Sequence, residues 1–137
     1  MRLLCTLFLF LSVSLHSAHA GMQNQYALVF FFDSTCNFCH RTAPKITLLG
    51  EQFQLPIYAF SVNGKGIPGF EVPIPVTPDI ARTFFPQTAY PTLPATFLIN
   101  VNSRKFARLS EGDVSLNQLS TSIQSALSDP RVLEALQ

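Results

Sequence analysis

The feature that most constrains the fold is a pair of cysteines that directly follows an apolar segment. Residues 26–32 are rich in Val and Phe without polar alternation, which is typical of a strand buried on both faces. Asp33-Ser34-Thr35 forms a polar break, and Cys36 and Cys39 then open a predicted helix. Two cysteines three residues apart on a first helical turn face the same side, with Cβ atoms about 5–6 Å apart. They can form a disulfide without large backbone movement, so a strand delivers a reversible dithiol to a helix N-terminus.

The position of Cys36 suits it to be a nucleophile. Only the thiolate attacks a disulfide, and a free thiol with a pKa near ~8.5 is mostly protonated at neutral pH. Unpaired N–H groups and the positive end of the helix dipole stabilise an anion at a helix N-terminus. We therefore predict that Cys36 attacks and that Cys39, more buried and protonated, resolves a mixed disulfide. His40 either favours the Cys36 thiolate as a protonated group or is a solvated helix residue.

A structural staple is the alternative role for the pair. The chain-entropy gain for closing a loop of about four residues is only roughly 2 kcal/mol, against about 4.7 kcal/mol for a 100-residue loop. Such a tight loop stabilises the fold weakly but forms a good redox couple. The spacing therefore favours redox chemistry.

Residues 1–20 have the character of a secretory signal peptide. Arg2 supplies a short positive segment, residues 3–15 are apolar, and Ala18-His19-Ala20 fits the small-x-small cleavage rule. Thirteen apolar residues are short for a membrane span, which disfavours an uncleaved anchor. We predict cleavage after Ala20, a mature domain of residues 21–137 in the periplasm, and no stable membrane insertion.

Cleavage would change the charge and cysteine counts. The chain has nine Lys and Arg, eight Asp and Glu, and three Cys, of which Arg2 and Cys5 lie in the predicted signal. The remaining eight basic and eight acidic side chains cancel, which gives no electrostatic basis for binding nucleic acid or an anionic membrane. The two remaining cysteines would lie in an exported, disulfide-permissive compartment.

Haem and zinc are the cofactors that the motif could also suggest. Cys-x-x-Cys-His is the attachment motif of c-type haem. Here it continues directly from a predicted strand, and Met22 is the only conventional second axial ligand in residues 21–137 apart from His40. Two cysteines and one histidine fall short of the four ligands of a structural zinc site. We predict no cofactor and no metal.

The remaining residues supply the other elements of an α/β domain. In order, we predict a helix from the cysteines to about residue 52, a strand over 57–62, a helix over 79–85, a hairpin of strands over 96–101 and 105–109, a helix capped by Ser115, and one or two further turns over 131–136. This order predicts a three-layer sandwich around a central four-stranded mixed sheet.

Prolines shape two parts of this chain. Pro44 lies inside the first helix and is expected to kink or break it. Residues 64–78 contain four prolines and three glycines, which exclude a helix and disfavour a long central strand. This segment is either a plain surface loop or a substrate-contacting loop. Phe84 and Phe85, after it, are expected in the core.

With these elements, residues 21–137 resemble a thioredoxin-fold protein over nearly their whole length. Members of that family have a proline five residues after the second cysteine, which Pro44 matches. They also have a cis-proline opposite the dithiol, just before the third core strand. Pro94 matches that position best, and Pro91 is the competing choice. The resemblance implies that Pro94 and the neighbouring Leu93 hold the substrate backbone beside the sulfur.

A finer resemblance is to exported isomerases. The segment from Phe32 to His40 is similar to the active-site pattern of DsbC. Together with Phe84-Phe85-Pro86 and residues 94–102, it looks most like the TrbB-type thiol-disulfide isomerases of F-type conjugative transfer systems. The resemblance implies an oxidoreductase that forms or reshuffles disulfides in periplasmic proteins of a conjugative type IV secretion system, served by a redox partner protein. A non-catalytic interaction subunit or chaperone of that machinery is the alternative.

Two departures from these families bear on the reaction. Thioredoxins carry a buried acid six residues before the first cysteine, where this chain has Phe30. Proton exchange with Cys39 would then use water or another group, which disfavours reductase chemistry. The dimerisation domain of DsbC has no counterpart in residues 21–137, so we expect a monomer, and isomerase and oxidase directions stay open.

Overall fold

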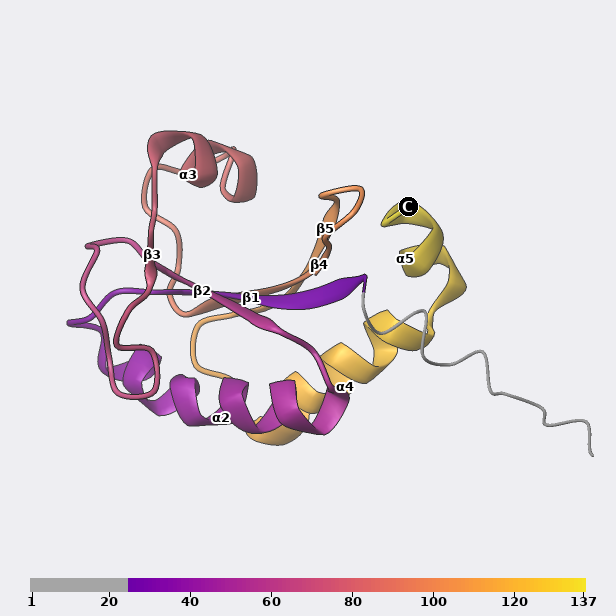
Figure 1. Ribbon diagram of the computed structural model, residues 1–137, viewed down its shortest axis with the longest axis horizontal. Coiled ribbons are helices and arrows are strands. Elements are labelled where there is room, and N and C mark those ends of the chain that lie inside the picture. Colours follow the sequence, from indigo (N-terminus) through magenta and orange to yellow (C-terminus); the bar gives the residue numbers. More distant parts are fainter. Residues whose placement is uncertain (1–24) are drawn as a thin grey trace, which may run out of the picture.

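The computed structural model describes residues 25–137, so the predicted signal peptide and its cleavage site lie outside the described residues. The described chain forms a mixed five-stranded sheet with the order β3-β2-β1-β4-β5 (Figure 1). Its elements are β1 (Tyr26–Phe32), α2 (Asn37–Phe53), β2 (Ile57–Ser61), β3 (Ile74–Pro75), α3 (Pro78–Phe84), β4 (Ala95–Asn100), β5 (Phe106–Glu111), α4 (Leu116–Ser128) and α5 (Pro130–Ala135).

β1 occupies the centre of the sheet because both of its faces are covered. All seven of its residues are buried, as predicted. It pairs in parallel with β2 and antiparallel with β4. Successive side chains point to opposite faces of a strand, and they divide between two hydrophobic cores. Leu28, Phe30 and Phe32 belong to one core. Val29 and Phe31 belong to the other.

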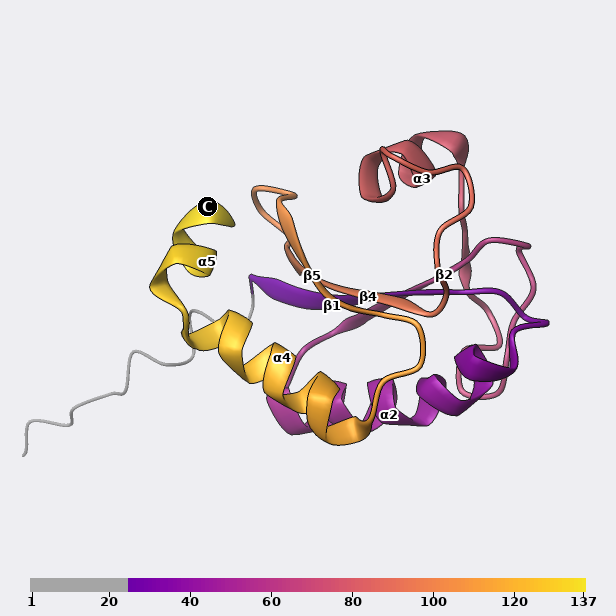
Figure 2. The ribbon, with the colours of Figure 1, turned by 180° about the vertical axis from the view of Figure 1, so that it is seen from behind.

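The two cores define three layers, which confirms the predicted thioredoxin-like sandwich. α2 and α4 lie on one side of the sheet and α3 lies on the other (Figure 1, Figure 2). Ile46 of α2 and Leu119 of α4 are fully buried in the first core. Phe84 and Phe85 fill the second core, as predicted, with their rings about Phe31.

The sheet has one strand more than the four predicted. β3 pairs in parallel with β2 at the sheet edge and lies inside the proline-rich segment 64–78. Prolines cannot donate to a ladder, which restricts such a strand to an edge. Part of the segment is also anchored to the sheet, because Ile67 is buried and the ring centroid of Phe70 lies 5.4 Å from that of Phe30.

α2 runs unbroken through Pro44, so the predicted break in this helix is wrong. Proline removes the N–H that would donate to the carbonyl of His40. Both residues are exposed, so water can hydrate that carbonyl. On the opposite face of the helix, Ala43 and Ile46 are buried and pack continuously on the sheet.

The other predicted elements are confirmed, with ends shifted by one or two residues. Thr77 caps α3 through its side chain, and Pro78 occupies the first turn. Ser115 caps α4 in a capping box with Gln118, in which each side chain accepts from the other residue's backbone N–H.

Replacing Phe31 with alanine tests the importance of the α3-side core. The Phe31 ring is fully buried, with centroids 5.0 Å from those of Phe60, Phe84 and Phe85. We expect Phe31→Ala to lower the free energy of unfolding by about 3–5 kcal/mol in urea titrations of the oxidised protein. Tyr90→Ala, at a side chain that is 91% exposed, should change it by less than about 0.5 kcal/mol. A loss below about 1 kcal/mol for Phe31→Ala would contradict this assignment of the core.

Candidate active site

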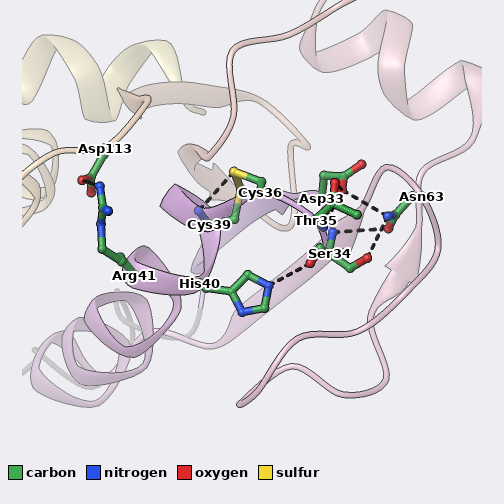
Figure 3. The surroundings of a disulfide bond; sticks show 9 residues. All are labelled: Asp33, Ser34, Thr35, Cys36, Cys39, His40, Arg41, Asn63 and Asp113. Carbon is green, nitrogen blue, oxygen red and sulfur yellow. Dashed lines mark hydrogen bonds and ion pairs between the residues drawn. A yellow bond between two sulfur atoms is a disulfide. The ribbon is translucent and has the colours of Figure 1, made fainter.

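The turn that follows β1 places Cys36 at the start of α2. The backbone N–H and hydroxyl of Thr35 donate to Asp33 Oδ1, at 2.7 and 2.6 Å, and Cys36 N–H donates to Asp33 O at 3.1 Å (Figure 3). The hydroxyl and then the amide of Thr35 lower the pKa of the Asp33 carboxyl. The carboxylate is therefore ionised at neutral pH and holds the turn. Cys36 is the N-cap of α2, with an extended backbone.

Cys36 and Cys39 form a disulfide, with their Cα atoms 5.2 Å apart. The N–H of Cys39 donates to Cys36 Sγ, at an N···S distance of 3.2 Å. Cys39 is fully buried, whereas Cys36 is partly exposed. The pairing and the difference in exposure agree with the sequence-based expectations. One cysteine thus lies partly exposed at a helix N-terminus, with an amide directed at its sulfur.

His40 is exposed and faces the turn rather than the disulfide. Its Nε2 lies 2.8 Å from Ser34 O, and Figure 3 shows the ring directed at that carbonyl. Because a carbonyl oxygen only accepts, Nε2 carries the proton. The structure therefore places His40 as a support for the turn before Cys36.

Asn63 is a site residue that no local sequence pattern singles out. Its Nδ2 donates to Asp33 Oδ1 at 3.1 Å and to Ser34 Oγ at 2.8 Å. Its Oδ1 accepts from Ser61 Oγ at 2.9 Å. The parallel register of β1 and β2 brings the ends of both strands together, so Asn63 follows β2 as Asp33 follows β1. A prediction that β1 and β2 pair in parallel would therefore have placed Asn63 beside Asp33.

Pro94 lies at the same end of the sheet as the dithiol. Phe31 pairs with Ala95, so the residue before β4 lies near the end of β1. The Leu93–Pro94 peptide bond is cis, which places the cis bond at Pro94 rather than at Pro91. Leu93 is half-buried and packs against both cores, and Cys36 packs against the first of them.

An apolar pocket adjoins Leu93. Its volume is about 370 Å³. The lining residues are mostly hydrophobic and include Val62, Val76, Phe85, Tyr90 and Leu93. The Tyr90 side chain is 91% exposed at the rim of this pocket. The segment before the cis-proline therefore offers an apolar surface beside the dithiol end of the sheet.

The buried polar groups of the described chain are neutral. Within residues 25–137 the buried polar residues are Thr42, Ser61, Thr96 and Asn100, none of which is an acid. Phe30, at the position of the thioredoxin acid, is fully buried and pairs with Thr96. The hydroxyls of Thr42 and Thr96 have no hydrogen-bond partner. A proton leaving Cys39 would therefore pass to water, directly or relayed by a hydroxyl, rather than to a buried carboxylate.

Metal-ligating side chains are scattered in the part of the chain that the structure describes. No three His, Cys, Asp or Glu side chains among residues 25–137 are grouped so as to hold a metal ion. None of the helices in this range combines the length and hydrophobicity required to cross a membrane.

The fold agrees with solved thioredoxin-like structures. A thiol:disulfide interchange protein of the thioredoxin family from Chlorobium tepidum TLS superposes with a TM-score of 0.57 and 18% identity, covering 80% of this chain and 84% of that one. The thioredoxin domain of a thiol-disulfide oxidoreductase from Bacteroides vulgatus gives a TM-score of 0.53 and 14% identity, covering 77% and 81%. At these identities the likeness shows the fold, which is that of thioredoxin.

Sequence comparison shows the family. Protein TrbB of Escherichia coli strain K12 is 33% identical over 87 residues, which are 64% of this chain and 48% of that protein. The chain thus spans about half the length of this curated relative. The family described as TraF, F plasmid transfer operon protein, matches residues 16–124. Since that match covers most of the 137 residues, and the predicted likeness to TrbB is confirmed, the chain belongs to the TraF family of F plasmid transfer operon proteins.

Proposed function

We propose that the chain is an exported thiol-disulfide oxidoreductase that forms or reshuffles disulfides in periplasmic proteins of a conjugative type IV secretion system. One observation carries this proposal. Cys36 and Cys39 form a disulfide at the N-terminus of α2, and of the two only Cys36 is partly exposed. Membership of the TraF family supports the link to conjugative transfer.

The reaction begins from the reduced pair. The Cys36 thiolate attacks one sulfur of a substrate disulfide, forming a Cys36–substrate disulfide and releasing the other substrate sulfur as a thiolate. In isomerisation, a substrate thiolate attacks this mixed disulfide and leaves Cys36 reduced. In reduction, Cys39 loses its proton, attacks Cys36 Sγ and releases the reduced substrate. Run in reverse from the oxidised pair, the same steps donate a disulfide to the substrate.

The start of α2 supplies the stabilisation that this mechanism needs. The amide of Cys39 already donates to Cys36 Sγ in the oxidised state, and the same amide can donate to the thiolate. The dipole of this 17-residue helix adds a favourable field at its N-terminus. Burial keeps the Cys39 sulfur away from solvent and from the substrate, so the substrate meets Cys36 first.

Substrate binding is assigned to the segment around Pro94. Leu93 and Pro94 lie at the end of the sheet where β1 delivers Cys36. The apolar pocket beside Leu93 would accept a hydrophobic side chain of a client protein. The described residues have no buried acid near Cys39, which favours isomerisation, the route in which Cys39 exchanges no proton, over the reduction and oxidation routes, in which it does.

The pH dependence of alkylation tests the reactivity of Cys36. In the reduced Cys39→Ser variant, we expect the iodoacetamide reaction of Cys36 to reach half its maximal rate below the pH of about 8.5 typical of a free cysteine. The helix N-terminus causes this shift by stabilising the thiolate. A half-maximal rate at or above the pH of free cysteine, measured in parallel, would contradict the proposed nucleophile.

Substitution of each cysteine tests the mechanism on a protein substrate. Cys36→Ser should abolish the recovery of a client protein with scrambled disulfides, because no mixed disulfide can form. Cys39→Ser should instead accumulate mixed disulfides, which mass spectrometry of the adducts would identify. If Cys36→Ser restores scrambled disulfides as well as the wild type, the chain is a non-catalytic interaction subunit or chaperone.

A further inference from the structure

We propose that Asp113 is a positioning residue that ties the dithiol helix to the Pro94 segment. This inference rests on the proposed function, because it concerns where a polypeptide substrate lies relative to Cys36. Asp113 lies in the turn between β5 and α4, far from the cysteines in sequence. Its contacts, and those of the residue before it, reach both halves of the site.

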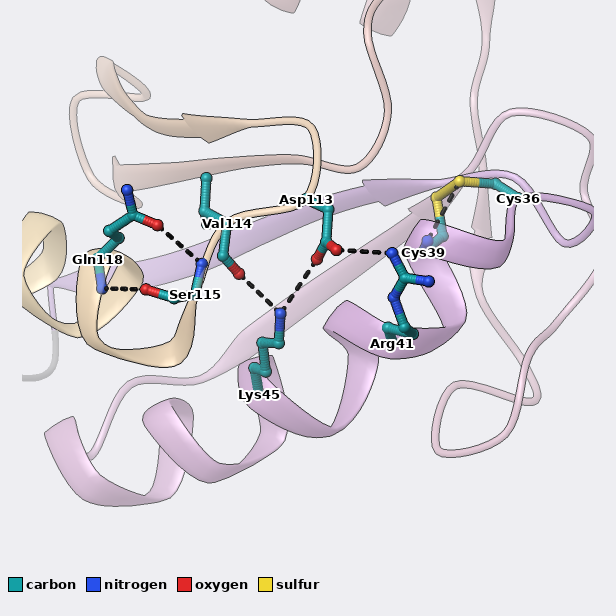
Figure 4. A network of polar contacts seen from close by, with 8 residues as sticks. All are labelled: Cys36, Cys39, Arg41, Lys45, Asp113, Val114, Ser115 and Gln118. Atoms are coloured by element: carbon teal, nitrogen blue, oxygen red, sulfur yellow. Dashed lines mark hydrogen bonds and ion pairs between the residues drawn. A yellow bond between two sulfur atoms is a disulfide. The ribbon is translucent and has the colours of Figure 1, made fainter.

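The first link joins Asp113 to α2. Arg41 Nη2 donates to Asp113 Oδ2 at 2.8 Å, and Lys45 Nζ donates to Asp113 Oδ1 at 3.1 Å. Lys45 Nζ also donates to Val114 O at 2.7 Å. Figure 4 shows both cations reaching from α2 to the turn. Arg41 and Lys45 are four residues apart and so share one face of the helix that carries the cysteines.

The second link joins the same turn to the cis-proline. Gly112 N–H donates to Pro94 O at 2.8 Å. Gly112 has φ of 71°, a conformation in which glycine is favoured over other residues. Two adjacent residues of one turn therefore bond to the two parts of the site. Gly112 bonds to the Pro94 segment, and Asp113 bonds to α2.

Arg41 extends the network to the exposed surface beside the dithiol. Its guanidinium carbon lies 4.6 Å from the ring centroid of Phe38, a cation–π distance. Phe38 lies between the two cysteines and is 50% exposed. By holding Arg41, Asp113 also restrains an aromatic side chain that a bound substrate would meet.

The charge on Asp113 suits this role. Hydrogen bonds from Arg41, and then from Lys45, lower the pKa of the Asp113 carboxyl. The carboxylate therefore stays ionised at neutral pH, and its links to α2 weaken only as the pH falls through the lowered pKa. An isolated exposed ion pair contributes little to stability. Here one carboxylate accepts from two cations, and the Lys45 and Asp113 side chains are only 24% and 27% exposed.

Asp113→Ala separates positioning from the chemistry of the sulfur. We expect the rate of exchange with a disulfide-bridged peptide to fall about three- to tenfold, because the Pro94 segment is held less tightly relative to the helix that carries Cys36. Alkylation of reduced Cys36 by iodoacetamide should stay within about twofold of wild type, because that small reagent needs only the sulfur. Asp113→Glu should recover most of the peptide rate.

Asp79→Ala is the matched control. Asp79 forms an ion pair with Arg82 on α3, outside the network described above. This variant should leave both rates unchanged. Equal losses of peptide exchange and alkylation in Asp113→Ala, or no loss of either, would overturn the positioning role.

Hydrogen exchange of the Gly112 amide tests the link without any activity. In Asp113→Ala this amide should exchange faster than in wild type, because the turn that holds it against Pro94 O is released. In Asp79→Ala it should exchange at the wild-type rate. Unchanged exchange in Asp113→Ala would refute the link. Absence of peptide exchange in the wild type would instead refute the proposed function, and the Gly112 amide would still decide the role of Asp113.

Discussion

The burial of β1 on both faces is the constraint on which the rest of the structure depends. Its alternating side chains hold α2 and α4 against one face and α3 against the other. Because β1 lies between β2 and β4, its end is surrounded by the ends of neighbouring strands. The turn that carries Cys36 therefore emerges beside Asn63 and Pro94. The pair of cysteines forms a candidate active site because the fixed position of β1 in the core places it beside these residues.

Two polar networks then hold the segments around Cys36 in place. Asn63 and Asp33 hold the turn before Cys36 from the β2 side. Asp113 holds α2 from the β5 side, through Arg41 and Lys45. Both networks lie at the surface and contribute modestly to the stability of the fold. Their effect is on geometry. They restrain the turn and the helix that position the Cys36 sulfur, which the hydrophobic core alone does not hold.

Local patterns predicted most of this fold, and long-range contacts account for what they missed. The buried strand, the helix cap at Ser115 and the dithiol each have a signal within a few residues. β3 has none, because two residues that include a proline carry no strand periodicity. The local sequence around Asp113 indicates only a solvated turn, because its partners on α2 are far away in the sequence. A helix-breaking effect was expected of Pro44, but hydration of one exposed carbonyl and packing of the opposite face outweigh it.

The central claim is that the disulfide is a reversible redox couple and not a structural staple. Its four-residue loop stabilises the fold little, while Cys36 lies partly exposed at a helix end, where another thiol can approach it. The most direct measurement is the equilibrium between this pair and a glutathione buffer of known potential. We predict a reduction potential above about −300 mV, in the range of redox-active disulfides. A potential below about −300 mV, as structural disulfides have, would contradict the account.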